Sequence, residues 1–200
     1  MGRGRGRGRL TRAVFLDRDG VLNDPVIDPV DGRPESPLRA ADVVLAEGAI
    51  EGCQALRAAG FLLVVVSNQP GAAKGKATRD ELREVHERVV SLLTAAGVTI
   101  DDWRYCLHHP EAVDPELRGD PCGCRKPAPG MLLDLAREHA IDLPASWMVG
   151  DSDADVGAGL AAGCSTVLIE HPGSAHRRSG QAQPAVLARN LSVAATLIGP

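Results

Sequence analysis

The sequence predicts an α/β fold with a parallel sheet flanked by helices, and two observations carry this prediction. Short apolar runs that stop abruptly alternate along the chain with longer segments whose apolar residues recur at helical spacing. This alternation is typical of parallel strands joined by crossover helices, a Rossmann-like arrangement. The length of 200 residues fits one domain. Aromatic residues make up only 2% of the chain, so the core has to consist of Ala, Val, Leu and Ile.

The first half of the chain supplies two of the strands. Residues 13–16 form an apolar run that stops at a charged residue, as a buried strand does, and residues 61–66 form a second run too short to indicate a helix. Between them, residues 24–40 are rich in proline and acids, which predicts a loop or flap. Residues 48–59 have helical spacing and end at Gly60, a suitable helix terminator.

The second half continues the alternation. The pair Thr78-x-x-Glu81 matches a capping box and predicts the start of a long helix that ends at Gly97. The remaining apolar runs predict strands at residues 103–107, 147–149 and 166–169, and helices at residues 131–139 and 155–162. Residues 106–130 are expected to form an irregular loop. A mobile polar stretch at 171–183 is expected to precede a short strand and a last helix near 191–197.

Glycine alternates with arginine at the start of the chain, and such a run cannot bury apolar surface. Residues 1–12 are therefore predicted to be a disordered leader, followed by a single domain over residues 13–200. A weak contact with RNA or with an acidic surface is one interpretation of the leader. A solvated leader without a role is the interpretation that we favour.

Composition also limits the partners. The longest apolar run is far shorter than the roughly 20 residues of a membrane-spanning helix, and Arg12 and Asp17 interrupt the only apolar patch near the start. An odd number of cysteines, five, without a signal peptide indicates reduced thiols. Few aromatic residues disfavour single-strand nucleic-acid binding. We expect a cytoplasmic monomer without a membrane or nucleic-acid partner, and we expect Cys53 and Cys164 to lie in the core.

Polar residues follow the predicted strands at their carboxyl ends, where sheets of this kind place their ligands. Asp17 and Asp19 follow the first strand, Ser67 and Asn68 follow the second, and Asp151 follows a later one. Two carboxylates at positions i and i+2 point the same way and repel each other unless a cation lies between them. Together with Asp151 they offer the hard oxygen ligands that suit Mg²⁺. A carboxylate there could attack phosphorus as a nucleophile.

Four segments resemble, in order, the motifs of the haloacid dehalogenase-like phosphatases. They are Phe15-Leu16-Asp17-Arg18-Asp19-Gly20-Val21-Leu22-Asn23, Val65-Val66-Ser67-Asn68-Gln69, Cys124-Arg125-Lys126-Pro127 and Val149-Gly150-Asp151-Ser152-Asp153-Ala154-Asp155. The resemblance covers residues 13 to about 170. The combination is similar to the histidinol-phosphate and heptose-bisphosphate phosphatase branch. Within that branch it is most similar to the D-glycero-D-manno-heptose 1,7-bisphosphate 7-phosphatases.

The resemblance implies an enzyme that hydrolyses a small phosphomonoester through an aspartyl-phosphate. Asp17 would be the nucleophile, and Asp19 would act first as acid and then as base. Ser67 would donate a hydrogen bond to a phosphoryl oxygen, and Lys126 would neutralise charge on the phosphoryl group and on Asp17. Mg²⁺ would be held by the Asp17 carboxylate, the Asp19 main-chain carbonyl and Asp151.

Two further residues are candidates for substrate binding. Asn68 lies beside Ser67, and Arg125 lies beside Lys126. The guanidinium of Arg125 could hold a second phosphate or a sugar oxygen in a two-point contact, although a surface ion pair is a competing interpretation. The segment between Ser67 and Arg125 has room for one helix, one strand and a loop, so no large cap domain is expected.

A second group of residues has the chemistry of a metal site. Cys106, His108, Cys122 and Cys124 are four soft ligands of the kind that hold tetrahedral Zn²⁺ without an open position. Their spacing is not the usual C-x₂-C pattern, so spacing alone does not decide the metal. The resemblance implies a zinc-binding loop over about 106–124, selects His108 over His109 and leaves His109 exposed. The loop has no apolar periodicity, and a metal would order it and fix the residues that follow.

The substrate has more than one interpretation. The family resemblance implies removal of the 7-phosphate of D-glycero-D-manno-heptose 1,7-bisphosphate. The flap at residues 24–37 looks longer than the substrate loop usual in that family, so histidinol phosphate or another small sugar phosphate is an alternative. A zinc-stapled binding module with a basic tail is an alternative from a different class. Such a module would not need Asp17, Asp19, Lys126 and Asp151 together.

Overall fold

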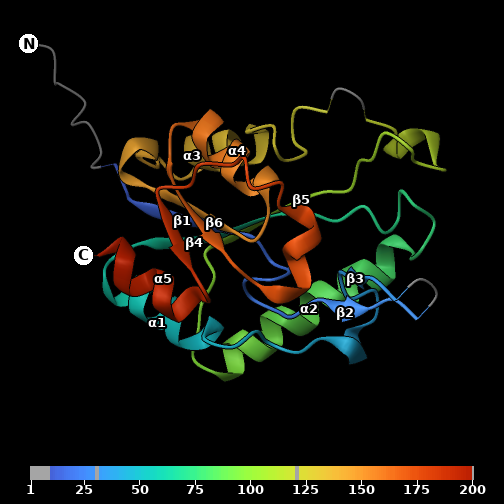
Figure 1. Ribbon diagram of the computed structural model, residues 1–200, viewed down its shortest axis with the longest axis horizontal. Helices are drawn as coiled ribbons and strands as arrows, with labels where there is room; N and C mark the ends of the chain where they lie inside the picture. Colours follow the sequence, from blue (N-terminus) through green and yellow to red (C-terminus); the bar gives the residue numbers. More distant parts are fainter. Residues whose placement is uncertain (1–9, 30–31, 120–121, 200) are drawn as a thin grey trace, which may run out of the picture.

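The computed structural model describes residues 10–29, 32–119 and 122–199, and its centre is a six-stranded parallel sheet (Figure 1). The order across the sheet is β5-β4-β1-β6-β7-β8. The strands are β1 (Ala13–Leu16), β4 (Leu62–Asn68), β5 (Asp102–Cys106), β6 (Trp147–Gly150), β7 (Ser165–Ile169) and β8 (Val186–Ala188). Every pair of neighbours in it is parallel, which confirms the predicted fold class.

Helices cover both faces of the sheet (Figure 1). One face carries α1 (Ala49–Ala58), α2 (Arg79–Ala95) and α5 (Leu191–Ile198), and the other carries α3 (Gly130–Glu138) and α4 (Asp153–Ala162). Successive side chains of a strand point to opposite faces, so Val14 and Leu16 pack with the first set while Ala13 and Phe15 pack with the second. Strand β1 is therefore buried on both sides, as its uninterrupted apolar run predicts.

Helix boundaries follow local capping. The predicted box at the start of α2 is present, because the Glu81 main-chain N–H donates to Thr78 Oγ1 at 3.1 Å and the Glu81 carboxylate accepts from Thr78 N at 2.8 Å. Helix α4 begins at Asp153 rather than at the predicted Asp155, because Ser152 caps it and the Asp155 carboxylate accepts from Ser152 N at 3.0 Å.

The predicted flap contains a short hairpin of β2 (Val26–Ile27) and β3 (Pro34–Glu35), followed by the 3-10 helix η1 (Ala40–Asp42). Lys76 holds the hairpin, since its Nζ lies 3.0 Å from Asp28 Oδ2 and 3.2 Å from Glu35 Oε1. Two further 3-10 helices, η2 (Pro115–Leu117) and η3 (Leu143–Ala145), lie in the connections after β5 and before β6.

The prediction of a mobile polar stretch at 171–183 is wrong for its first half. Residues Pro172–Arg177 form the 3-10 helix η4, and Ser174 is completely buried. The next residue, Arg178, donates from Nη1 to three main-chain carbonyls, those of Asp151, Ile169 and His171. The polar composition misled the prediction because these groups are satisfied by the protein rather than by water.

Residues 1–9 of the predicted leader lie outside the described residues. The predicted end of the leader at residue 12 is too late, because Thr11 already pairs with Ile141, and the guanidinium of Arg12 lies 4.4 Å from the centre of the Phe61 ring. Cys53 and Cys164 are buried in the core, as predicted. In the part of the chain that the structure describes, no helix combines the length and the apolar character needed to cross a membrane.

Candidate active site and metal centres

The candidate site lies beside β1, at the point where the order of the strands across the sheet reverses. After β1 the chain adds β4 and β5 on one side of it, and then adds β6, β7 and β8 on the other side. Ligands of such sheets bind at the carboxyl ends of the strands at this reversal. A cavity of about 330 Å³ opens there. Its lining includes Asp17, Asp19, Ser67, Asn68, Gln69, Lys74, Arg125, Lys126, His176 and Arg177.

Asp17 has one oxygen held and the other free. Its Oδ1 accepts from Ser67 Oγ at 2.6 Å and from Arg18 N at 2.7 Å, and Lys126 Nζ lies 3.0 Å away. Within the described residues, no donor binds Oδ2. Burial raises the pKa of Asp17 and outweighs the opposing effect of Lys126, so its charge is costly without a further cation. The arrangement leaves one carboxylate oxygen available to a ligand or to phosphorus.

Asp19 lies in a cradle of donors. Arg18 donates to both of its carboxylate oxygens at 3.0 Å, Gln69 Nε2 donates to Oδ2 at 2.7 Å, and Asn23 Nδ2 donates to Oδ1 at 2.9 Å. Burial opposes the charge of Asp19, but Arg18 and these hydrogen bonds outweigh it and lower the pKa. The carboxyl group is therefore ionised in this state and is oriented by three neighbours.

Lys126 joins two strand ends. Its Nζ donates to Val66 O at 2.7 Å and lies 3.0 Å from Asp17 and 2.5 Å from Asp155 Oδ1. Burial opposes its charge, but the two carboxylates outweigh burial and raise the pKa of Lys126. A fully buried ammonium is thus kept charged next to Asp17, where a phosphoryl group would need it.

Three buried carboxylates lie close together, and one of them, Asp17, also lines the cavity. One oxygen each from Asp17, Asp151 and Asp155 lies within 4.8 Å of the others. Burial and the charges of Asp17 and Asp155 raise the pKa of Asp151 to about 8, and its Oδ1 is buried without a hydrogen-bond partner among the described residues. An orphaned acceptor amid like charges fits a bound divalent cation, and oxygen donors of this kind suit Mg²⁺.

The residues predicted to bind substrate border the same cavity. Asn68 already makes a two-point contact with the main chain of Lys126: its Nδ2 donates to the carbonyl and its Oδ1 accepts from the N–H, both at 3.0 Å. Its role in substrate binding stays a prediction. In the structure, its two hydrogen bonds fix the main chain at Lys126. Arg125 Nη1 donates to His108 O at 3.0 Å, which leaves its other donors for a ligand.

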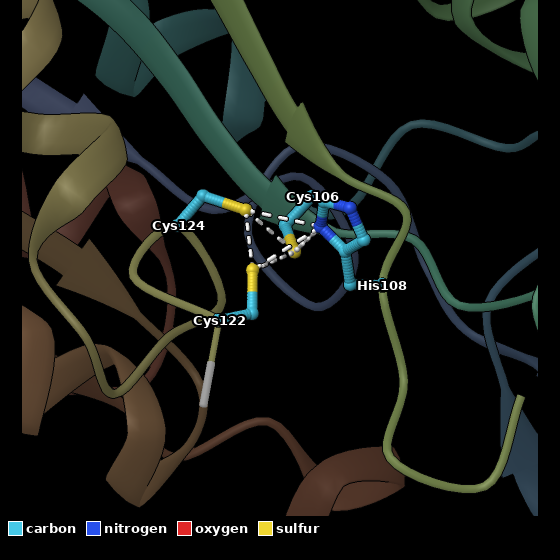
Figure 2. A group of neighbouring side chains, drawn as sticks. All are labelled: Cys106, His108, Cys122 and Cys124. Atoms are coloured by element: carbon cyan, nitrogen blue, oxygen red, sulfur yellow. Dashed lines mark hydrogen bonds between the residues drawn. The ribbon is translucent and has the colours of Figure 1, made fainter. Parts of the chain in front are cut away.

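Figure 2 shows that Cys106, His108, Cys122 and Cys124 point toward one another. The six separations among His108 Nδ1 and the three sulfur atoms run from 2.8 to 3.8 Å. A tetrahedron of Zn²⁺ ligands with bonds of about 2.3 Å has edges of about 3.8 Å, so the four atoms form a contracted tetrahedral group that could hold a metal ion. All three cysteines are free thiols. The four ligands predicted from the sequence are brought together.

His109 does not belong to this group. Its Nδ1 accepts from Glu111 N at 3.1 Å within a turn. The prediction that His109 is exposed is wrong, because the residue as a whole is half-buried. The geometry agrees with the choice of His108 as the ligand.

Sequence reasoning missed several residues of the site. Asp155 contacts Lys126 and stands beside Asp17 and Asp151, and the S-x-x-D capping pattern at Ser152 was a signal that could have found it. Gln69, which binds Asp19, had no signal beyond its place after a strand. His176 and Arg177 reach the cavity from η4, in the segment predicted to be mobile.

Known proteins resemble this chain over most of its length. The model of the family described as HAD-hydrolase-like matches residues 123–194. The chain is 36% identical over 172 residues to the D-glycero-beta-D-manno-heptose-1,7-bisphosphate 7-phosphatase of Yersinia pestis, covering 85% of this chain and 86% of the relative. It is 32% identical over 187 residues to the D-glycero-alpha-D-manno-heptose-1,7-bisphosphate 7-phosphatase of Photorhabdus laumondii, covering 94% and 96%.

A solved structure is similar over nearly the whole chain. It is that of D,D-heptose 1,7-bisphosphate phosphatase from B. bronchiseptica complexed with magnesium and phosphate. The TM-score is 0.78 at 27% sequence identity, and the match covers 94% of this chain and 98% of that one. The fold and the order of its elements are therefore shared along the length of both proteins.

Proposed function

Because this chain belongs to the haloacid dehalogenase-like phosphatases, we propose that it removes the 7-phosphate of D-glycero-D-manno-heptose 1,7-bisphosphate. The observation that carries the proposal is Asp17 itself. It stands at a strand end with one oxygen held by Ser67 and Lys126 and the other free toward the cavity. Relatives that act on this bisphosphate match most of the chain, which supports the choice of substrate.

In the first step we place Asp17 as the nucleophile. A carboxylate oxygen attacks the phosphorus of the substrate, the bond from phosphorus to the sugar oxygen breaks, and an aspartyl-phosphate forms. Asp19 supplies the proton that the leaving alkoxide needs. Because Arg18 and Gln69 favour its anion in the substrate-free state, Asp19 has to take up a proton as the substrate binds.

In the second step Asp19 acts as base. It takes a proton from the water that attacks the aspartyl-phosphate, which releases phosphate and restores Asp17. The anionic form, which the hydrogen bonds from Arg18 and Gln69 favour by lowering the pKa of Asp19, is the one this step requires. Ser67 and Lys126 stabilise charge on the phosphoryl oxygens in both steps, and they are already in place around Asp17.

Mg²⁺ would be held by the Asp17 carboxylate, the Asp19 main-chain carbonyl and Asp151, with Asp155 beside them. Bound there, it would neutralise charge on the transferred group. Zn²⁺ would be held by Cys106, His108, Cys122 and Cys124 as a structural ion. The ion would order the loop before Arg125 and Lys126, because Cys124 precedes Arg125 directly and Arg125 donates to the carbonyl of His108.

Arg125 and Asn68 complete the proposed site on the substrate side. Arg125 would bind the phosphate that is not transferred, and Asn68 would contact the substrate from the lip of the cavity. We also propose a cytoplasmic monomer with a single domain over residues 13–200. Free thiols at all five cysteines support the reducing compartment.

The decisive experiment is a panel of phosphate esters with purified protein. We expect Mg²⁺-dependent phosphate release, highest kcat/KM for heptose 1,7-bisphosphate, and a product that retains the 1-phosphate by ³¹P NMR. Both anomers belong in the panel, because relatives of both specificities match the chain. Higher kcat/KM for histidinol phosphate would overturn the substrate, and no Mg²⁺-dependent hydrolysis of any ester would overturn the activity.

A further inference from the structure

Residues 171–179, which we name the η4 segment, have no role in the proposed reaction yet contact its centre. Ser174 Oγ donates to Asp151 Oδ2, although the two residues lie far apart in the chain. Ser174 is completely buried. A buried hydroxyl that reaches from another loop to a proposed metal ligand requires a physical reason, because an apolar residue at this position would need no hydrogen-bond partner.

The bond decides how the Asp151 carboxylate is presented. With Oδ2 bound by Ser174, Oδ1 is the oxygen left without a hydrogen-bond partner in the described part of the chain. Gly20 leaves room for the same oxygen, since a Cβ at Gly20 would lie only 2.0 Å from Asp151 Oδ2. The carboxylate thus has one oxygen held by Ser174 and one left for a ligand beside Asp17 and Asp155.

The η4 segment is itself anchored, so Ser174 holds Asp151 and not the reverse. Ser174 N donates to His171 O at 3.1 Å, and Arg178 Nη1 donates to His171 O at 3.1 Å and to Asp151 O at 3.2 Å. At the far end, Ser179 N and Oγ donate to Asp153 Oδ2 at 2.6 and 2.5 Å. Contacts at both ends hold the position of the Ser174 hydroxyl relative to β6.

We propose that Ser174 is a positioning residue of the metal centre, which holds Asp151 with one oxygen free for Mg²⁺. The inference rests on the proposed function only in taking Asp151 as a Mg²⁺ ligand. Hydrogen bonds that orient ligating carboxylates affect metal affinity by about 10–100-fold when they are removed. Without Ser174, Asp151 can rotate, and part of the binding energy is used to order it again.

The test measures Mg²⁺ binding by isothermal titration calorimetry in the absence of substrate. We expect Ser174→Ala to raise the Mg²⁺ dissociation constant about 10-fold or more, while kcat at saturating Mg²⁺ stays within about threefold of wild type. Ser174→Cys keeps the size of the side chain but donates weakly, and it should shift the constant in the same direction. It also provides a measurement if the alanine variant fails to fold.

Ser146→Ala is the matched control. Ser146 is equally buried, but it binds Ala13 N and Asp142 O at the opposite end of the sheet, so its loss should lower stability without changing Mg²⁺ affinity. Dissociation constants within twofold of wild type for both Ser174 variants would overturn the proposal. Wild-type protein that binds Mg²⁺ but hydrolyses no phosphate ester would overturn the proposed function and leave the role of Ser174 standing.

Discussion

Asp17 illustrates how a single carboxylate can be costly for the fold and necessary for the reaction. The carboxylates of Asp155 and Asp19 repel it, and Lys126, 3.0 Å away, offers a compensating charge. An asparagine would keep nearly the same shape and remove the repulsion. Activity and stability should therefore move in opposite directions when this residue is changed.

We predict that Asp17→Asn lowers kcat to less than about a thousandth of wild type, because an amide cannot form the aspartyl-phosphate. In the presence of EDTA the variant should melt at the same temperature as wild type or higher. The reason is that burial raises the pKa of Asp17, so the ionised form opposes folding. Steady-state kinetics and thermal unfolding check both statements. A variant with substantial activity would exclude covalent catalysis by Asp17.

Arg125 is the residue whose role depends most on the substrate. We predict that Arg125→Ala lowers kcat/KM for heptose 1,7-bisphosphate about 10–100-fold, the loss expected for one charged contact to a phosphate. The value for p-nitrophenyl phosphate should change no more than about threefold, because that ester carries no second phosphate. Arg83→Ala, on the exposed face of α2, serves as the control for lost positive charge. Equal losses on both substrates would assign Arg125 to the transferred phosphate or to the fold.

At the scale of elements, the loop between β5 and α3 has little core of its own, so we expect its order to depend on the four proposed zinc ligands. Only Ala112 and Leu117 of the loop are buried apolar residues in a small cluster of the described chain. The end of the loop carries Arg125 and Lys126 into the cavity. Order in the loop and geometry at the active site are thus linked through Cys124.

We predict one tightly bound zinc per chain in protein purified without added zinc. Cys122→Ser should lose the metal and lower kcat, because Arg125 and Lys126 are then less firmly placed. Cys164→Ala, which removes a buried thiol outside the cluster, should retain zinc. Metal analysis by mass spectrometry measures the content directly. Active wild-type protein without zinc would contradict the prediction.

At the scale of the whole molecule, local patterns predicted what is locally determined. Uninterrupted apolar runs located β1 and β4, and the acids and hydroxyls after them located most of the site. The order of strands in the sheet could not be read in this way, because it depends on contacts between distant segments. The capping pattern at Ser152 could mark Asp155 as a residue to inspect, but it could not reveal the contact of Asp155 with Lys126. The contact of Ser174 with Asp151 was equally hidden, since each contact joins two different elements.

The same reason explains the error over the η4 segment. Its sequence is polar, and polar stretches are on average solvated. Here Arg178 Nη1 donates hydrogen bonds to three main-chain carbonyls, and Ser174 is buried against Asp151. The segment is therefore part of the folded structure. Composition cannot distinguish a polar loop bound to water from one bound to the protein. A polar loop bound to the protein can be told from a solvated one only when the ends of β6 and β7, which it contacts, are known.

The three buried carboxylates that lie close together come from distant points of the chain, Asp17 after β1 and Asp151 and Asp155 after β6. An unfolded chain does not bring them together, so a cation that binds them stabilises the whole fold. We predict that Mg²⁺ at about 100 times its dissociation constant adds about 2.7 kcal/mol to the free energy of unfolding relative to EDTA. Chemical denaturation at matched ionic strength measures the increment.

Asp151→Asn separates this effect from general screening of charge. The variant removes one ligand and much of the repulsion, so it should be no less stable than wild type in EDTA and should gain little from Mg²⁺. Sodium chloride at equal ionic strength should leave both proteins nearly unchanged, because the three carboxylates are buried and poorly screened. An equal Mg²⁺ increment in wild type and variant would place the cation elsewhere. A large increment confined to wild type would link folding of the sheet to assembly of the active site.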